Sequence, residues 1–282
     1  MTYPAWPGPE AIFCPATTIA PMTEARRWTL MGSGEWRGAG LAGRRGMDPC
    51  CLSPETSGTT EKLFVMIDPV LADLWPPYGL IIVTPRLELR LPHEEELAAL
   101  AHLAGEGVHG PDERPFLTPW TEGLAEDRRR FVLQEHWCQL GQWTVAAWQL
   151  GLGVFRQGEP LGMVTLRARD FLVVREVATS SWLGLGYQGK GYGTEARVGL
   201  LTLAFDHLDA RAARTEVFQD NAASQRVSRK LGYEPDGISV DARGSEALVS
   251  DRLRLTREKW TQEERTAVQV HGMTDCRPMF GL

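Results

Sequence analysis

The stretch Gly184-Leu-Gly-Tyr-Gln-Gly-Lys-Gly-Tyr-Gly193 decides the fold class of this 282-residue chain, because it sets five glycines within ten positions. An extended apolar run, Leu172 to Leu183, leads into it, and apolar residues recur at four-residue steps from Ala196 to Leu208 after it. These patterns predict a strand, a glycine turn and an amphipathic helix in that order. Backbone N–H groups at such a helix start favour an anion, so we expect the turn to bind phosphate.

Of the three phosphate-binding motifs that can be laid on this stretch, the dinucleotide motif is matched weakly and the P-loop motif fails on its mechanics. Gly184, Gly186 and Gly189 spell the dinucleotide pattern G-x-G-x-x-G, which needs an acid about 20 residues later at the end of the next strand. Asp206 has that distance but falls at a helix end, whereas Asp220 ends the next strand but lies too far away. The P-loop pattern G-x-x-x-x-G-K needs a following Ser or Thr to coordinate magnesium, and this chain has glycine there.

The third motif is Q-x-x-G-x-G, formed by Gln188, Gly191 and Gly193, and its flanks extend the match. The flanking motifs are Ser181-Trp182-Leu183-Gly184, Gly193-Thr194-Glu195-Ala196, Asp220-Asn221-Ala222-Ala223-Ser224, Lys230-Leu231-Gly232-Tyr233, Thr84-Pro85-Arg86-Leu87 and Leu253-Arg254-Leu255-Thr256. With these motifs the chain resembles the GNAT superfamily of acyl-CoA-dependent N-acyltransferases, in particular its RimJ/RimL-like branch and an actinobacterial-type subgroup. The resemblance covers about residues 80 to 262 and is most specific from Gly151 to Gly237.

The other periodicities predict an α/β (α+β) chain. Helices are expected over His93 to Ala104, over Ala125 to Leu140 and from Asn221 to Leu231, and two strands flank a turn at Gln157 to Pro160. Leu80 to Leu91 is interpreted as one extended opening strand that Pro85 interrupts, which favours an edge position. The resemblance implies the GNAT fold, a central, mostly antiparallel mixed sheet flanked by helices.

Composition divides the chain near residue 65. Residues 1–65 mix Pro, Gly, Ser and Thr without lasting periodicity, so we expect an irregular or disordered N-terminal extension. Met66 follows at once, which raises the hypothesis that translation naturally starts there. Residues 66–262 are predicted to form the GNAT acyltransferase domain, and residues 263–282 a C-terminal tail.

Charge, hydropathy and cysteine usage exclude several classes of function. The net charge is -6 and Lys and Arg do not cluster into a basic domain, so nucleic acid is not expected as a partner. The chain lacks an apolar stretch of transmembrane length and a secretory signal, so no membrane role is expected. Five cysteines without metal-ligand spacing predict free thiols, no metal site and a cytoplasmic protein. A homodimer is left open.

The resemblance also implies a cofactor site for acetyl-CoA or succinyl-CoA as acyl donor, without a metal. The backbone of Trp182, Leu183 and Gly184 would pair with the pantetheine arm, and N–H groups from Gly189 to Gly193 would hold the pyrophosphate. The full expected set is Trp182, Leu183, Gly184, Gln188, Gly189, Lys190, Gly191, Tyr192, Gly193, Thr194, Asn221 and Ser224. Asn221 is equally well explained as a helix N-cap alone.

The chain departs from the family pattern at the catalytic groups. The branch often places a glutamate four residues before the tryptophan of this strand, and here that position is Ala178. Glu176 lies two residues earlier on the same side of a strand, so it is either a displaced general base or a surface glutamate. The tyrosine that protonates the thiolate in many GNAT enzymes is replaced by Ser228. Ser224 is therefore the candidate for cofactor contact and proton donation, and Asp251 is the candidate at the acceptor site.

The resemblance implies an enzyme that transfers an acyl group to a primary amine by direct attack on the thioester. The acceptor would be a protein N-terminus, a lysine or a small amine. Two alternatives stay open. The missing base and tyrosine are also compatible with a GNAT-shaped domain that binds acyl-CoA without turnover. The G-x-G-x-x-G pattern is compatible with a nucleotide-binding oxidoreductase.

Overall fold

A computed structural model describes residues 69–243, 245–262 and 265–282 of the chain. The expectations for residues 1–65, including a start at Met66, lie outside this described part. The described chain begins with helix α1 (Pro69–Leu74) and the 3₁₀ turn η2 (Pro76–Gly79).

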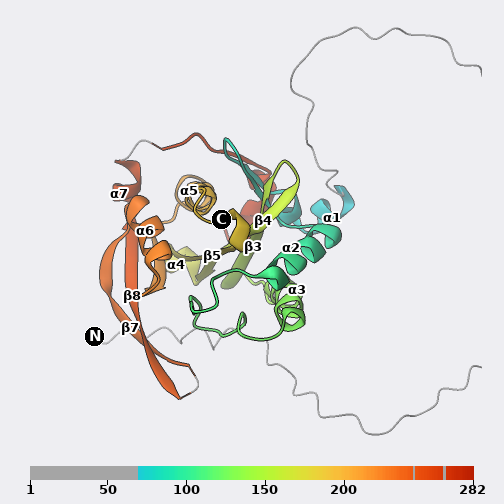
Figure 1. The fold of residues 1–282 in the computed structure, drawn as a ribbon. Coiled ribbons are helices and arrows are strands. Elements are labelled where there is room, and N and C mark those ends of the chain that lie inside the picture. Colours follow the sequence, from blue (N-terminus) through green and yellow to red (C-terminus); the bar gives the residue numbers. More distant parts are fainter. Residues whose placement is uncertain (1–68, 244, 263–264) are drawn as a thin grey trace, which may run out of the picture. The chain divides into compact units, whose positions relative to one another are not determined.

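A single nine-stranded sheet organises the described residues, with the strand order β7-β8-β6-β5-β4-β3-β2-β1-β9 (Figure 1). The strands are β1 (Ile81–Val83), β2 (Glu88–Arg90), β3 (Ala147–Arg156), β4 (Glu159–Arg169), β5 (Glu176–Leu183), β6 (Ala212–Phe218), β7 (Glu234–Arg243), β8 (Glu246–Thr256) and β9 (Gln269–His271). Every neighbouring pair is antiparallel except β5 and β6, which run parallel. The predicted mostly antiparallel mixed sheet is confirmed.

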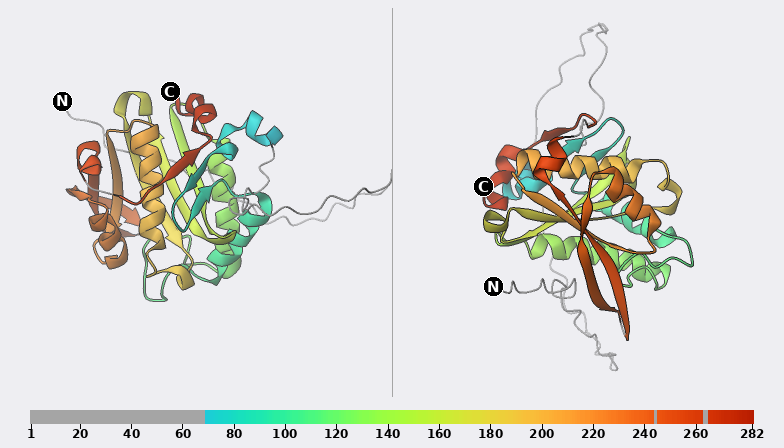
Figure 2. Two further views of the ribbon diagram at one scale, coloured as in Figure 1. Left: turned by 90° about the horizontal axis from the view of Figure 1, so that it is seen from above. Right: turned by 90° about the vertical axis from the view of Figure 1, so that its left-hand side faces the viewer.

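Helices cover both faces of this sheet because strand side chains alternate between the faces. We call the side of Thr179 and Val177 the α5 face; it packs against α5 (Tyr192–Thr202) and α6 (Ala222–Lys230). We call the side of Glu176 and Trp182 the α2 face; it is partly covered by α2 (Glu94–Glu106) and α3 (Ala125–Gly141). Figure 2 gives two further views, in which the β7–β8 hairpin projects beyond the other strands.

Two hydrophobic clusters match the two faces. The larger cluster joins buried side chains of the inner strands, such as Leu152 and Val164, to Leu200 of α5. The smaller cluster packs Leu100 of α2 and Val132 of α3 against the sheet. Burial of this kind is the main driving force for holding helices on a sheet. The remaining short elements are α4 (Phe171–Val174), η3 (Leu185–Tyr187), the π-helical turn η4 (Leu203–His207), α7 (Arg257–Thr261), α8 (Met273–Cys276) and η5 (Arg277–Phe280).

Two of the expected strands differ from the structure. The run from Leu172 to Leu183 is not one strand, because the helical turn α4 occupies its start, with Asp170 and Arg175 in the left-handed region (φ 50° and 53°) on either side. Residues 80 to 91 form two antiparallel three-residue strands, β1 and β2, rather than one. The Thr84 hydroxyl accepts a hydrogen bond from the N–H of Leu87 (3.1 Å) and closes the turn between them.

The last residues of the chain join the sheet. Strand β9 pairs with β1, so the opening strand does not lie at the edge that Pro85 led us to expect. Beyond β9, the side chains of Cys276 and Phe280 are fully buried in the larger cluster. We set residues 263–282 apart as a tail. The described part of this segment thus contributes a strand and core side chains.

Candidate functional site

The glycine turn lies between β5 and α5 and has a backbone that suits an anion. Gly189 and Gly191 adopt left-handed φ values of 73° and 83°, which residues with a Cβ rarely adopt. Gly191 is the N-cap of α5. The first hydrogen bond of this helix runs from the N–H of Glu195 to the carbonyl of Gly191 (3.1 Å). Within the described chain, the N–H groups of residues 189–193 have no hydrogen-bond acceptor. They are therefore available to a ligand at the positive end of the helix.

Gln188 fixes the start of this turn. Its side-chain amide donates hydrogen bonds to the carbonyl of Leu183 (3.0 Å), at the end of β5, and to the carbonyl of Val108 (2.7 Å), in the α2–α3 connection. The side chain thus holds the turn against two neighbouring segments. This anchoring gives Gln188 a structural role in the Q-x-x-G-x-G motif.

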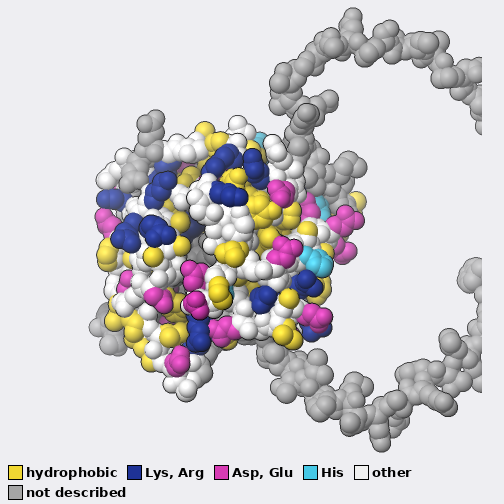
Figure 3. Space-filling model, viewed as in Figure 1, with side chains coloured by type: hydrophobic (Ala, Val, Ile, Leu, Met, Phe, Trp, Pro, Cys, Tyr) yellow, Lys and Arg dark blue, Asp and Glu magenta, His cyan; other side chains and the backbone are white. Residues whose placement is uncertain are grey.

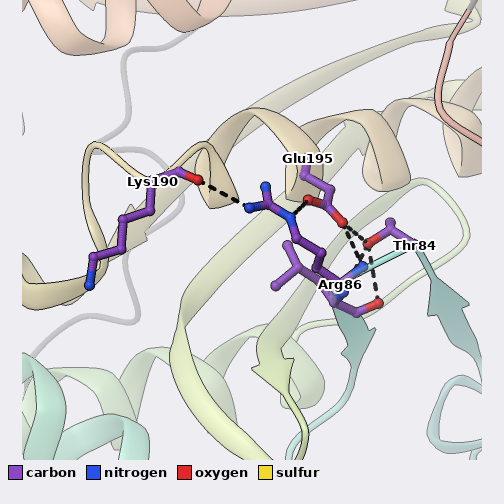
Figure 4. Close-up of polar contacts among 5 residues, drawn as sticks. Thr84, Arg86, Lys190 and Glu195 are labelled. Atoms are coloured by element: carbon purple, nitrogen blue, oxygen red, sulfur yellow. Dashed lines mark hydrogen bonds and ion pairs between the residues drawn. The ribbon is translucent and has the colours of Figure 1, made fainter.

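A second anchor joins the β1–β2 turn to the first turn of α5 (Figure 4). The Glu195 carboxylate accepts hydrogen bonds from the Thr84 hydroxyl (2.7 Å), from the backbone N–H of Arg86 (2.8 Å) and from the Arg86 Nε (2.6 Å). The Arg86 guanidinium also donates to the carbonyl of Lys190 (3.2 Å). Thr84, Arg86 and Glu195 occur in the sequence motifs, but their pairing across the fold could not be inferred from one sequence.

Basic side chains gather around the turn. The Arg86 guanidinium lies over the ring of Tyr192 (4.7 Å to the centroid), and that of Arg156 lies at 5.8 Å from the same ring. The Lys190 ammonium lies 5.8 Å from the Tyr187 ring. Figure 3 shows groups of Lys and Arg side chains on the face of the molecule viewed there. These cations provide a favourable electrostatic environment for a phosphorylated ligand.

The parallel ladder between β5 and β6 ends before either strand does. The last paired residues are Ala178 and Arg214, whereas β5 continues to Leu183 and β6 to Phe218. Beyond this point a side-chain hydroxyl replaces the backbone donor, because Thr215 Oγ1 donates a hydrogen bond to the carbonyl of Thr179 (3.2 Å). On its other edge β5 stays paired with β4 as far as Leu183. The β5 backbone beyond Thr179 is therefore free of β6 pairing, next to the glycine turn.

Glu176, the expected displaced base, lies at the start of β5 and belongs to an ion-pair network. Its carboxylate pairs with Arg214 and, at 3.2 Å, with Arg254. The Glu176 side chain is 14% exposed. Two guanidinium groups from neighbouring strands thus already engage the Glu176 carboxylate.

Ser224 and Asp251 lie on the α5 face. The Asn221 side chain accepts a hydrogen bond from the N–H of Ser224 (3.0 Å), so the N-cap interpretation of Asn221 is confirmed. Asp251 of β8 accepts hydrogen bonds from the amides of Gln219 (3.0 Å) and Gln225 (2.8 Å). Since Asp251 is paired with Val217, and Glu176 with Ala212, alternation places the two carboxylates on opposite faces of the sheet.

The acetyltransferase (GNAT) domain family matches residues 86–234, which is more than half of the chain. The chain belongs to this family. Solved structures share the fold of this GNAT protein. The GNAT-family acetyltransferase from Bacillus anthracis is 17% identical, with 63% of this chain and 99% of that chain covered and a TM-score of 0.50. RimL, the ribosomal L7/L12 alpha-N-protein acetyltransferase in its apo form, is 19% identical, with coverages of 62% and 93% and a TM-score of 0.50.

The family match confirms the GNAT resemblance, and the solved structures share its fold. The sheet also disfavours the dinucleotide-binding interpretation, because a doubly wound fold requires a mostly parallel sheet. None of the helices in the described part of the chain has the length and apolar character needed to cross a bilayer. The described residues also contain no group of three or more His, Cys, Asp or Glu placed to hold a metal ion.

Proposed function

We propose that this GNAT protein transfers an acyl group from acyl-CoA to a primary amine. The observation that carries the proposal is the run of N–H groups from Gly189 to Gly193, which have no acceptor among the described residues and follow the part of β5 that β6 leaves unpaired. An acyl-CoA would supply an activated thioester, which an amine attacks without a covalent enzyme intermediate. In such a reaction the protein contributes position and charge stabilisation.

The donor would lie along β5 and the start of α5. N–H groups from Gly189 to Gly193 would hold the pyrophosphate, with Lys190 and Thr194 beside it. The unpaired edge of β5 at Trp182, Leu183 and Gly184 would pair with the pantetheine amides. Acetyl is the expected acyl group, and succinyl is the alternative. We keep Ser224 as a candidate for cofactor contact and proton donation and Asp251 as a candidate at the acceptor site.

Two carboxylates on the α2 face compete for the role of general base, Glu176 and Glu216. Ala178 stands at the position where the branch often has a glutamate, and it pairs with Arg214 in the parallel ladder. Glu216 lies two residues beyond Arg214 on β6, on the same face of the sheet. Glu216 is exposed and forms no ion pair with any described residue, whereas Glu176 has two arginine partners. Burial lowers the pKa of nearby Arg167, and the charges of Glu216 and Glu135 counteract that lowering. The ion pairs of Glu176 favour Glu216 as the base.

Calorimetry combined with an assay for CoA release tests the function. We expect CoA to bind, and free thiol to appear when acetyl-CoA or succinyl-CoA is mixed with an acceptor. The panel would contain a peptide with a free N-terminus, a lysine peptide with a blocked N-terminus and small amines. CoA binding without thiol release from any pair would favour the non-catalytic acyl-CoA-binding alternative. Affinity for NAD with none for CoA would refute both.

A further inference from the structure

A buried arginine lies where the β5–β6 ladder ends. Arg197, in α5, is 3% exposed. Its Nη2 donates a hydrogen bond to Thr179 Oγ1 (2.8 Å), and its Nη1 donates to Ser228 Oγ (3.3 Å). The ring of Tyr233 lies 5.3 Å from the guanidinium carbon, and the Tyr233 hydroxyl is 3.3 Å from Thr179 Oγ1. Arg197 thus connects the donor-side helix α5 to both β5 and α6.

Arg197 has no ion-pair partner among the residues that the structure describes. Within the described part of the chain, no Asp or Glu forms an ion pair with it, and its Nε is buried without a hydrogen-bond partner. Thr179 and Ser228 are neutral and are 4% and 0% exposed. Burying a cation is costly unless an opposite charge accompanies it. A guanidinium in this setting is therefore arranged for an anionic group that a ligand brings.

We propose that Arg197 stabilises the negative charge of the CoA thiolate as it leaves. This inference rests on the proposed function. The amine nitrogen forms a bond to the thioester carbonyl carbon and gives its proton to a carboxylate base. The C–S bond then breaks, its electron pair stays on sulfur, and the thiolate is held by the guanidinium until Ser224 or solvent protonates it. A fixed cation would stabilise this charge beside Ser228, which replaces a tyrosine and accepts a hydrogen bond from the same guanidinium.

The ionisation of bound CoA tests this directly, because a thiolate has an ultraviolet absorption band that the thiol lacks. If Arg197 faces the sulfur, the pKa of the CoA thiol falls on binding, and near pH 7 the thiolate fraction rises about tenfold over that of free CoA. The measurement needs only the wild-type protein with CoA, and desulfo-CoA serves as the blank. Bound CoA with an unchanged thiol pKa overturns the inference and leaves the proposed function intact. Failure to bind CoA overturns both.

Variants assign the effect to the residue. Arg197→Gln should return the thiolate fraction to the value of free CoA and lower kcat at least tenfold, whereas Arg197→Lys should retain part of both. Arg229→Gln is the matched control, because it removes an exposed cation from the adjacent helix α6. If Arg197→Gln does not fold, the wild-type titration still decides. A different result would show that the anion is the acyl carboxylate and that the thiolate assignment is wrong. In that case the wild-type protein prefers succinyl-CoA, Arg197→Gln abolishes the preference, and the pKa of the bound CoA thiol is unchanged.

Discussion

Arg86 and Glu195 form an ion pair with an Nε–Oε2 distance of 2.6 Å that connects the β1–β2 turn to the first turn of α5. The Arg86 side chain is 46% exposed, and that of Glu195 is 10% exposed. Because Arg86 also holds the carbonyl of Lys190, the pair fixes the glycine turn as well as the helix. It is thus a structural element of the proposed cofactor site that the β1–β2 turn contributes.

Glu195→Gln should weaken this connection while it preserves side-chain shape. We expect a loss of about 1 kcal/mol in the free energy of unfolding, since hydrogen bonds to charged groups are stronger than neutral ones but exposure reduces the gain. CoA affinity should also fall, because the turn is less rigid. Urea denaturation and calorimetry would measure the two effects. Glu126→Gln is the control, because it removes an exposed α3 ion pair with Arg130 and should change neither quantity appreciably.

Gly191→Asp should abolish CoA binding in a folded protein. The substitution adds a Cβ at a left-handed φ of 83° and places a negative charge beside the pyrophosphate. Gly191→Ala, which adds the backbone strain and a contact of its Cβ with Arg86 Nη2 (3.3 Å) but no charge, should weaken binding less. Gly186→Ala is the matched control in the same segment, because its φ is not left-handed and no atom lies within 4 Å of the added Cβ. Equal CoA affinity in Gly191→Asp and wild type would refute the placement of the pyrophosphate.

Local features of the fold could be predicted from the sequence because they depend on neighbouring residues. The turn before α5 follows from its glycines, and the cap at Asn221 follows from a side chain that accepts a bond three residues away. The break at α4 could not be predicted in this way, because Leu172, Val173 and Val174 are typical strand residues. Left-handed Asp170 and Arg175, which carry no glycine signal, turn the chain there instead.

Long-range pairing accounts for the remaining differences. The return of β9 to β1 depends on residues far apart in the chain, and no single-sequence pattern indicates it. The ion pairing of Glu176 depends in the same way on Arg214 and Arg254, which come from two other strands. In the sequence, Arg197 occupies an ordinary position of an amphipathic helix. Only the fold brings Thr179 and Ser228 beside it.

His136 should make the domain less stable in mild acid. It is 3% exposed on α3, and burial lowers its pKa from 6.5 to about 4. Because the unfolded chain binds this proton more readily, the free energy of unfolding should fall as the pH drops from 6.5 towards 4, by on the order of 3 kcal/mol at most. Urea denaturation at several pH values would measure the slope. His136→Leu should flatten it, whereas His102→Gln, at an exposed position on α2, should leave it unchanged.

The last prediction separates the two candidate bases. If Glu216 removes the proton from the incoming amine, Glu216→Gln should lower kcat about 10²-fold and remove the limb of the pH–rate profile that reports the base, while CoA affinity stays. Glu176→Gln should instead lower stability, because it breaks the charge pairing of Glu176 with Arg214 and Arg254. Its pH–rate limb should persist in the fraction that remains folded. The opposite pattern, a lost limb in Glu176→Gln and a normal profile in Glu216→Gln, would assign the proton transfer to Glu176. Its two arginines would then have to release the carboxylate when the amine binds.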